Sequence, residues 1–594
     1  MTLDQRVTLA EHLKQYRSLD LGYSKQEKQI KVAILASVTT KGFKESLKVQ
    51  LAQLGVYGEL YVADYMQYAQ EILNPDSELY RFQPDAIFLF IDTRTFLGES
   101  YFLPYSLSDS TRKRKVRSQL NQLQAFIDVL CSRTRAKIIV HNFEVPIYSP
   151  LGLLENKRQF GLLEAVHWLN SKMNKLYKSN NQVFVLDYEL FCSRVGKERV
   201  FDYTRYYLAD IKVSLDIVPE LMAMYVGYLR PLVGLNKKCL VLDLDNTLWG
   251  GVIGEDGISG IKLGPTPEGR SFWEFQMYIK SLFERGVILA VCSKNNLDDV
   301  IEVFRNHPYM LLQEENFAAI QVNWNDKASN LRAIAKEINI GLDSLVFFDD
   351  DALNRALVKQ ELPEVSVVDV PANPAQYLPV LAGLNEFNLL RLTDEDWEKG
   401  KMYAQQRSRN QYAATATNLD DFLASMEMVV EIESADETTL PRVAQLTQKT
   451  NQFNLSTRRY QEEDIAAMIG DKACAVLTVK VKDKFGDNGL TGVCIVKKAA
   501  DEWLIDSLLL SCRIIGRQVE ESLLWYLITQ AQRAKVVRLI GEYAPTQKNQ
   551  LVADFYSKNG FVLKASEGEM QQWIFDLSKP FEKPNYISHK TYSQ

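Results

Sequence analysis

Cysteine and histidine are scarce in this chain of 594 residues, which has seven of the former and five of the latter. No two cysteines form a C-x-x-C pair, so we expect neither a disulfide scaffold nor a structural zinc site. No apolar run approaches the roughly 20 residues that a membrane-spanning helix needs, and the first residues lack the apolar core of a signal peptide. These absences favour a cytoplasmic protein with reduced thiols and no membrane partner.

An excess of one charge is also missing. The chain has 69 Lys and Arg residues against 75 Asp and Glu, for a formal net charge of -6. Because nucleic-acid binding leaves a basic stripe, we do not expect nucleic acid as a partner. A composition of 46% hydrophobic and 24% charged residues is near the globular average and excludes wholesale disorder. At roughly 100–200 residues per domain, the length predicts about three to five domains.

Two successive stretches alternate short apolar runs with segments of helical periodicity. The runs lie at 31–36, 57–63, 86–91, 137–141 and 182–187 in the first stretch, and at 239–244, 286–291, 318–322 and 345–348 in the second. Apolar runs between helices are typical of parallel strands that are buried on both faces. The sequence therefore predicts two parallel α/β domains, at 1–234 and 235–385.

The pattern changes after these two stretches. Residues 386–418 are polar and weakly periodic, which favours a linking helix. Three strand-like runs then follow in close succession, as in an antiparallel meander, and a helix, a strand and a second helix come after them. The runs lie at 473–482, 489–497 and 503–511, and the later elements at 518–533, 536–541 and 549–558. Residues 419–594 are therefore expected to form an α+β domain.

The run at 239–244 ends in two aspartates, Asp243 and Asp245. Their spacing directs both side chains to one side at the carboxyl end of a buried strand, where open parallel sheets bind ligands. Two close carboxylates repel each other unless a cation joins them, so the pair indicates a Mg²⁺ site. Alone, the pair is also compatible with a simple turn that carries two hydrated acids.

Other polar residues follow at the corresponding ends of neighbouring elements. Ser293 ends the next strand and precedes a helix, a position that suits a phosphate group. Lys327 opens a later helix and offers fixed positive charge. Asp349 and Asp350 follow the fourth strand and bring more carboxylates to the same edge. We expect the next acid, Asp351, to cap a helix.

The order D-x-D-x-T, then Ser, then Lys, then two aspartates resembles the haloacid-dehalogenase superfamily. That resemblance implies a Rossmann-like domain that forms an aspartyl phosphate, with Asp243 as the nucleophile and Asp245 as the general acid/base. About 20 residues separate Thr247 from the next helix, too few for a cap domain, so we expect a capless site. The resemblance also implies catalytic support from Asp349, phosphate binding by Thr247, Ser293 and Lys327, and Mg²⁺ binding by Asp243, Asp245 and Asp350.

Longer words in the sequence are similar to those of the FkbH-like proteins. These words begin at Asp243 (DLDNTLWGGVIGEDG), Cys292 (CSKN), Gln448 (QKTNQFNLSTRR), Phe485 (FGDNG) and Ser511 (SCRIIGR). The resemblance spans about residues 30–577. It implies that a glyceryl-type acyl group passes from 1,3-bisphosphoglycerate to acyl carrier protein, with removal of phosphate and a thioester on an enzyme cysteine. Cys292, next to Ser293, is the first candidate for that thiol, and Cys512 is the second.

The outer domains carry weaker signals. The loop at Arg513, Gly516 and Arg517 follows a strand and precedes a helix, so its backbone N–H groups could bind pyrophosphate. The surrounding order of elements resembles the GNAT acetyltransferase fold, which implies a slot for the phosphopantetheine arm of acyl carrier protein. In the first domain, Ser37 stands where SGNH hydrolases keep their nucleophile, but the late histidine of those enzymes is missing. We therefore expect a degenerate, SGNH-like domain.

Three hypotheses follow from these patterns. The first is transfer of a glyceryl-type acyl group to acyl carrier protein. The second is a plain Mg²⁺-dependent phosphatase whose outer domains select the substrate. The third is a carrier-binding module in which the hydrolase site is vestigial, which the complete set of acids disfavours. The sequence leaves open the order of acyl transfer and dephosphorylation, the acyl group and the oligomeric state.

Overall fold

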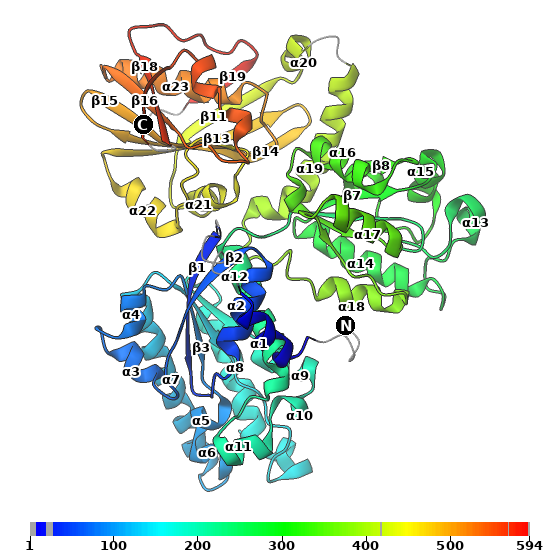
Figure 1. The fold of residues 1–594 in the computed structure, drawn as a ribbon, viewed down its shortest axis with the longest axis vertical. Helices are drawn as coiled ribbons and strands as arrows, with labels where there is room; N and C mark the ends of the chain where they lie inside the picture. The colour runs from blue at the N-terminus through cyan, green and yellow to red at the C-terminus, as the bar shows by residue number, and fades with distance from the viewer. Residues whose placement is uncertain (1–6, 20–25, 27, 416–418, 568–569, 592–594) are drawn as a thin grey trace. The chain divides into compact units, whose positions relative to one another are not determined.

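A computed structural model describes residues 7–19, 26, 28–415, 419–567 and 570–591. The chain divides into two compact units (Figure 1). One contains residues 1–235 with 388–391, and the other contains residues 236–387 with 392–594. The last three residues of the expected linking segment, 416–418, lie outside the described residues.

The first unit is built on a parallel sheet of five strands in the order β2-β1-β3-β4-β5. The strands are β1 (Lys28–Ala36), β2 (Val56–Val62), β3 (Ala86–Phe90), β4 (Lys137–His141) and β5 (Val183–Leu186). Alternate residues of β1 belong to two different apolar clusters, Val32 and Ile34 to one and Ala33 and Leu35 to the other. Because both faces of the sheet are covered, the strand is a continuous apolar run rather than an alternating one.

Helices cover both faces of this sheet. Helices α2 and α12 pack in the first cluster, and α7 and α8 in the second. The helices of the unit are α1 (Leu9–Arg17), α2 (Phe43–Gln53), α3 (Tyr68–Leu73), α4 (Glu78–Phe82), α5 (Thr93–Leu97), α6 (Glu99–Phe102), α7 (Asp109–Arg133), α8 (Leu162–Tyr177), α9 (Tyr188–Val195), α10 (Lys197–Val200), α11 (Tyr203–Ala209) and α12 (Val218–Leu232).

The second unit begins with another five-stranded parallel sheet, in the order β10-β9-β6-β7-β8. Its strands are β6 (Cys239–Leu242), β7 (Ile288–Ser293), β8 (Phe317–Val322), β9 (Leu345–Phe348) and β10 (Ser366–Val367). Chain order reverses at β6, which lies between β7 and β9. In such sheets the ligand site lies beyond the carboxyl ends of the strands at the reversal point.

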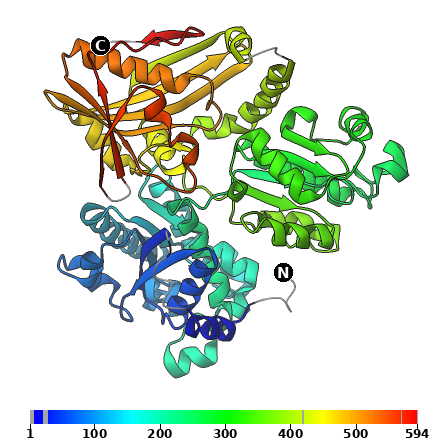
Figure 2. The same cartoon turned by 45° about the horizontal axis from the view of Figure 1, so that its top comes forward.

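Helices lie on both faces of this second sheet as well, as Figures 1 and 2 show. They are α13 (Ile253–Gly260), α14 (Arg270–Glu284), α15 (Leu297–Asn306), α16 (Lys327–Ile338), α17 (Ala352–Glu361) and α18 (Tyr377–Ala382). Short α13 is the one helix between β6 and α14, so no separate domain covers the carboxyl end of β6.

A mixed sheet forms the C-terminal part of the second unit, in the order β17-β18-β16-β15-β14-β13-β11-β19. Strands β13 to β15 form the expected antiparallel meander, and β16 adds parallel to β15. The strands are β11 (Met428–Ser434), β12 (Phe453–Asn454), β13 (Cys474–Asp483), β14 (Gly486–Lys498), β15 (Glu502–Leu510), β16 (Arg538–Tyr543), β17 (Val562–Glu567), β18 (Met570–Asp576) and β19 (Ile587–Thr591). The helices are α20 (Leu419–Ser425), α21 (Leu440–Lys449), α22 (Glu462–Gly470), α23 (Val519–Arg533) and α24 (Phe555–Lys558).

Two parallel α/β sheets followed by a mixed α+β sheet confirm the fold class that the sequence predicts. Within the expected linking segment, α19 runs from Asp394 to Thr415. This helix is joined to the C-terminal sheet by an ion pair. Arg409 Nε lies 2.9 Å from Asp483 Oδ2, and these side chains are 1% and 0% exposed. Arg517, 6% exposed, lies 3.4 Å from the same carboxylate.

We expect Asp483→Asn to lower the free energy of unfolding by about 3–5 kcal/mol, because it leaves two buried guanidinium groups without their counter-charge. Denaturant unfolding followed by circular dichroism measures the loss. Asp487→Asn is the matched control, since its ion pair with Lys482 is about half exposed and is worth about 0–1 kcal/mol. Equal destabilisation by the two variants would contradict this interpretation of the buried pair.

Candidate active site

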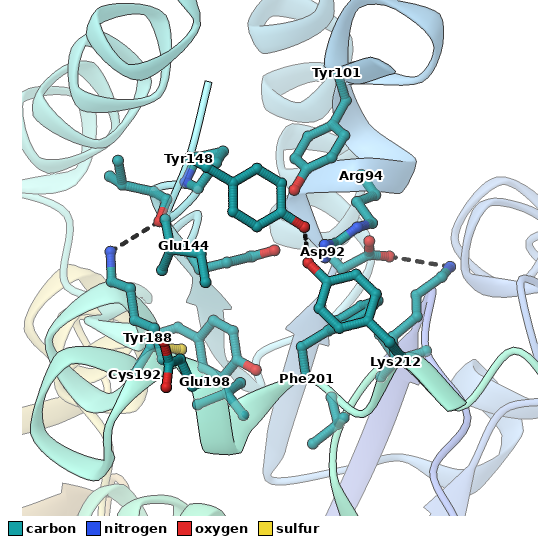
Figure 3. A pocket seen from close by; sticks show the side chains of 18 of the residues that line it. Asp92, Arg94, Tyr101, Glu144, Tyr148, Tyr188, Cys192, Glu198, Phe201 and Lys212 are labelled. Carbon is teal, nitrogen blue, oxygen red and sulfur yellow. Dashed lines mark hydrogen bonds and ion pairs between the residues drawn. The ribbon is translucent and has the colours of Figure 1, made fainter. Parts of the chain in front are cut away.

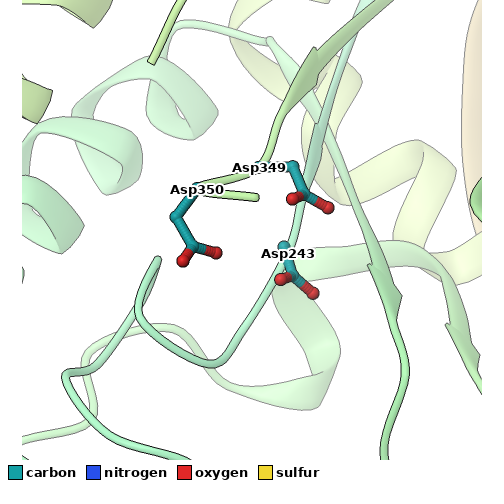
Figure 4. Close-up of side chains that lie close together, drawn as sticks. All are labelled: Asp243, Asp349 and Asp350. Atoms are coloured by element: carbon teal, nitrogen blue, oxygen red, sulfur yellow. The ribbon is translucent and has the colours of Figure 1, made fainter. Parts of the chain in front are cut away.

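Three carboxylates meet at the carboxyl edge of the second parallel sheet (Figure 4). Asp243 follows β6, and Asp349 and Asp350 follow the neighbouring strand β9. One oxygen of each carboxylate lies within 4.8 Å of an oxygen of the others. Asp349 is fully buried and Asp243 is 7% exposed. The edge that the strand order singles out therefore carries a concentrated negative charge.

A hard divalent cation fits this donor set. Burial, and then the charges of Asp243 and Asp349, raise the pKa of Asp350 to about 6. Carboxylate oxygens are the ligands that Mg²⁺ prefers, and a cation among them would remove the repulsion that raises this pKa. Asp243, Asp349 and Asp350 are therefore the residues that would hold Mg²⁺.

Lys327 supplies the fixed positive charge of the site. Its Nζ lies 2.7 Å from Asp243 Oδ1 and 2.9 Å from Asp349 Oδ2, and it donates a 2.8 Å hydrogen bond to the carbonyl of Cys292. The side chain is 1% exposed. Burial opposes its charge, but the two carboxylates outweigh burial and raise its pKa. Lys327 thus orients Asp243 and stays charged.

Asp245 does not join the acidic group, and in this respect the expected set of metal ligands differs from the structure. Its carboxylate accepts hydrogen bonds from Trp249 Nε1 at 2.9 Å, from the backbone N–H of Ile253 at 3.1 Å and from Asn295 Nδ2 at 3.0 Å. These donors turn the carboxylate away from the other acids, so Asp349 takes its place in the group. Burial raises the pKa of Asp245, as a proton donor requires.

The two expected phosphate-binding hydroxyls are buried at the same edge. Thr247 is fully buried, and its Oγ1 donates a long hydrogen bond, 3.4 Å, to Asp350 Oδ1. Ser293 is 1% exposed, and its Oγ accepts a 3.1 Å hydrogen bond from Asn295 Nδ2. The amide of Asn295 therefore joins Ser293 to Asp245. Our sequence interpretation missed this role, although Asn295 stands two residues after Ser293 in the CSKN word.

Arg355 is a second residue that sequence reasoning missed. Its guanidinium donates hydrogen bonds to the backbone carbonyls of Asp349, at 2.8 Å, and Asp350, at 2.6 Å. Both carbonyls belong to the turn that presents the acidic pair. Asp351 caps α17, and Arg355 lies four residues later, on the first turn of that helix. This spacing is the sequence signal that could have indicated the role of Arg355.

Cys292 lies on the opposite face of its strand from Ser293. Its side chain is fully buried in an apolar cluster with Cys239, Val241 and Ile288. Burial raises the pKa of Cys292 to about 12, although Lys327 pulls it down. Cys292, the first candidate for the acyl-carrying thiol, is therefore poorly suited to that role, because successive residues of a strand point to opposite faces and its side chain faces the core.

Cys512, the second candidate thiol, is partly exposed. It follows β15, and its Sγ lies 2.9 Å from the hydroxyl of Tyr403 on α19. The thiol borders a cavity of about 200 Å³. Six basic residues line this cavity: Lys238, Lys399, Arg442, Lys449, Arg513 and Lys548. Cys512 therefore combines access with nearby positive charge.

The two arginines of the expected pantetheine loop are buried, at 5% and 6% exposed. Arg513 stacks over the ring of Tyr403, and Arg517 is paired with Asp483. The backbone N–H of Gly516 donates a 3.2 Å hydrogen bond to the carboxylate of Glu520. That N–H is the kind of donor that an incoming pyrophosphate would need, so the side chain of Glu520 competes for it.

In metal-free protein, we expect the free energy of unfolding to fall by about 1–2 kcal/mol as the pH rises from about 4 to 6, once solvent screening is allowed for. The folded pKa of Asp350, about 6, lies above the ordinary value of 3.8, so the folded state binds the extra proton in this interval.

Mg²⁺ should then raise the Tm more at pH 7.5 than at pH 5. Calorimetry with and without EDTA measures this. An unchanged Mg²⁺ effect in Asp350→Asn, with Asp369→Asn as control, would argue against the assigned ligands.

The family model of the FkbH N-terminal domain matches residues 31–227. Among solved structures, the N-terminal part of a Bacteroides fragilis protein, which contains a phosphatase domain and was crystallised with Mg, is 31% identical to this chain. That match covers 65% of this chain and 100% of the other, with a TM-score of 0.60. Ard1 from Thermoplasma volcanium is 14% identical over 25% of this chain and 97% of its own, with a TM-score of 0.21. The GNAT domain of S. lividans PAT is 15% identical over 24% and 89%, also with a TM-score of 0.21.

A search of curated proteins finds no match. Among the described residues, no helix is both long and apolar enough to cross a membrane. The Bacteroides fragilis structure matches along its whole length at 31% identity, and the FkbH model matches the first domain. The acids, the lysine and the hydroxyls assembled at the carboxyl edge of the second sheet form a phosphatase site of the haloacid-dehalogenase type. On these grounds the chain belongs to the FkbH-like proteins.

Proposed function

We propose that this enzyme transfers a glyceryl-type acyl group from 1,3-bisphosphoglycerate to acyl carrier protein and removes a phosphate group with the help of Mg²⁺. The observation that carries the proposal is the buried assembly of Asp243, Lys327 and Asp349 in a chain of the FkbH-like family. The Mg-bound phosphatase domain of the Bacteroides fragilis relative supports the choice of metal.

At the phosphatase site, the carboxylate of Asp243 attacks the phosphorus atom of a phosphate ester. A new bond forms between its oxygen and phosphorus while the bond to the departing alkoxide breaks. Asp245, whose pKa is raised by burial, gives that alkoxide a proton. Water then attacks the aspartyl phosphate and loses a proton to Asp245, which returns both acids to their starting states. A bound Mg²⁺ would offset the repulsion between these carboxylates and the phosphoryl group.

The acyl step needs a thiol, and the structure favours Cys512 over Cys292. The cavity beside Cys512 is lined by six basic residues and by two acids, Asp343 and Asp396. This excess of basic side chains would attract a phosphorylated substrate. Attack of the thiolate of Cys512 on the acyl carbon forms a thioester and expels the 1-phosphate as inorganic phosphate. The thiol of the pantetheine arm then displaces Cys512.

The two steps take place at different edges of one sheet. Lys238 precedes β6 and lines the cavity of Cys512, whereas Asp243 follows β6. Five residue-to-residue steps of extended strand separate them, or about 16 Å at about 3.3 Å per step. A three-carbon substrate is too short to reach both sites at once. We therefore propose that the remaining 3-phosphate is removed in a separate event, from an acyl group that has left Cys512.

The experiment is the mass of acyl carrier protein after incubation with this enzyme, Mg²⁺ and enzymatically generated 1,3-bisphosphoglycerate. The proposal predicts a carrier with one glyceryl group and no phosphate. In EDTA, acylation should continue and the carrier should keep a phosphoglyceryl group. A carrier of unchanged mass, in a sample that still releases phosphate, would contradict acyl transfer.

The competing function is a plain Mg²⁺-dependent phosphatase, which the C-terminal loop favours. Glu520 occupies the N–H of Gly516, and Arg517 is held by Asp483, so two of the groups expected to bind the pantetheine arm already have partners within the protein. A phosphatase needs no pantetheine slot and no cysteine. Phosphate release that is unaffected by loss of either Cys292 or Cys512, with no acyl group on the carrier, would establish this reading.

A further inference from the structure

The first unit contains a cavity of about 320 Å³ that the proposed reaction does not use (Figure 3). It opens beyond the carboxyl ends of β1, β3 and β4, where Val38, Asp92 and Glu144 contribute to its lining. This edge of a parallel sheet is the usual place for ligands, and the volume suits a small organic molecule.

No reactive nucleophile is accessible among the described lining residues. Ser37 is fully buried, and its Oγ donates a 2.7 Å hydrogen bond to Asp92 instead of facing the cavity. Cys192 lines the cavity but is 1% exposed, and burial raises its pKa. His141 is buried against Phe90 and is not part of the lining. The cavity is therefore built for binding rather than for hydrolysis.

Aromatic rings surround a single guanidinium in this cavity. Arg94 lies over the ring of Phe201 at 3.6 Å and within 4.8 Å of the centre of Tyr101. The hydroxyls of Tyr148 and Tyr203 are hydrogen bonded to each other, and both side chains are partly exposed to solvent. Figure 3 shows Arg94, Tyr101 and Tyr148 turned toward the same space. Flat rings beside a guanidinium suit a ligand with a flat or apolar body and a negative charge.

The other cations of the lining already have carboxylate partners. Lys212 Nζ lies 3.3 Å from Asp92 Oδ2, and Lys197 Nζ lies 2.5 Å from Glu189. Within the described part of the chain, the guanidinium of Arg94 has neither a hydrogen-bond acceptor nor an ion-pair partner. A planar group with five N–H donors matches a carboxylate or phosphate in a bidentate fashion.

Glu144 lines the same cavity and could compete with an anionic ligand for Arg94, but its carboxylate is poorly suited to neutralise the guanidinium. Thr93 Oγ1 donates a 2.5 Å hydrogen bond to its carboxylate. Burial, and then the charge of Asp92, raise its pKa to about 7. The carboxylate of Glu144 is thus held by Thr93, and among the described residues no ion pair joins it to Arg94.

From this geometry we propose that the first unit binds a small organic anion, with its carboxylate or phosphate on Arg94 and its body against Tyr101, Tyr148 and Phe201. The site is separate from the phosphatase site and does not depend on the proposed transfer reaction. It would give this SGNH-like domain a binding role in place of hydrolysis.

The test measures binding of three probes, benzoate, phenyl phosphate and benzyl alcohol, to the full chain by saturation-transfer difference NMR. EDTA is present, so that phenyl phosphate is not consumed at the phosphatase site. We expect one or both anions to bind at least tenfold more tightly than the neutral alcohol. Arg94→Met should remove this preference and Arg94→Lys should reduce it. Arg81→Met is the matched control, because Arg81 is 65% exposed and paired with Glu78.

Intact folding of each variant is checked by its Tm and by phosphatase activity, which should be unchanged in Arg94→Met. Three results would overturn the proposal. They are equal binding of anions and alcohol, anion binding that survives Arg94→Met, and absence of binding by millimolar benzoate and phenyl phosphate. Failure of Asp243→Asn to affect phosphate release would sink the phosphatase assignment and leave this proposal standing.

Discussion

Asp243→Asn is expected to reduce phosphate release by about 10³-fold or more, which is the scale of losing a catalytic nucleophile. The amide keeps the shape of the side chain and can still accept the 2.7 Å hydrogen bond from Lys327, so the fold should survive. What it loses is the charged oxygen that attacks phosphorus. Steady-state release of inorganic phosphate from acetyl phosphate and p-nitrophenyl phosphate, with saturating Mg²⁺, measures the effect.

Asp369→Asn is the control for this variant, since the side chain of Asp369 is 88% exposed and lies outside the acidic group. Its activity should stay within twofold of the parent. If Asp243→Asn retained a tenth or more of the parent activity, Asp243 would not be the nucleophile. The remaining phosphate release would then have to come from other residues.

Cys512→Ala is expected to abolish the acyl-enzyme adduct and to slow transfer to the carrier by at least about 10²-fold, because the covalent route is lost. The phosphatase activity should be unchanged, since the cavity of Cys512 lies at the other edge of the sheet from Asp243. Intact mass after exposure to 1,3-bisphosphoglycerate reports the adduct, and a carrier assay reports transfer.

Cys292→Ala supplies the contrast. Its thiol is buried in an apolar cluster with its pKa raised to about 12, so removal should leave a small cavity that costs about 1–2 kcal/mol of stability, and the adduct should persist. An adduct that disappears in Cys292→Ala and survives in Cys512→Ala would reverse the assignment of the thiol.

Local sequence pattern predicted much of the second parallel sheet. The apolar runs expected at 239–244, 286–291, 318–322 and 345–348 correspond to β6, β7, β8 and β9 within two residues at each end. Strand ends and helix starts carry the polar residues of the site, and in a parallel sheet these ends converge on one edge. This is why the sequence alone predicted that Asp243, Lys327 and Asp349 lie close together, although they are far apart in the chain.

Side-chain direction within the site could not be obtained from spacing alone. Asp243 and Asp245 both follow β6, but Trp249, Ile253 and Asn295 draw the carboxylate of Asp245 aside. These donors come from three different segments, and their meeting depends on how the chain folds after β6. The support of the acidic turn by Arg355 likewise appears only once α17 is in place.

The C-terminal sheet was predicted less completely, because much of it is formed by distant pairs. Strand β11 pairs in parallel with β19, more than 150 residues later, and neither was expected from its local pattern. The helix expected at 549–558 is interrupted, with a short 3₁₀ turn at Gln550–Val552 followed by α24. Asn549 accepts a hydrogen bond from the backbone N–H of Thr546 and donates one to the carbonyl of Asn454, which ties the start of this segment to strand β12.

A covalent phosphoryl group on Asp243 can be detected by acid-quenching the first turnover of acetyl phosphate, labelled at phosphorus with ³²P, in the presence of Mg²⁺. We expect label on the peptide that contains Asp243, release of that label by hydroxylamine, and no label in Asp243→Asn. Release of inorganic phosphate during the first turnover with no label on any peptide would contradict it.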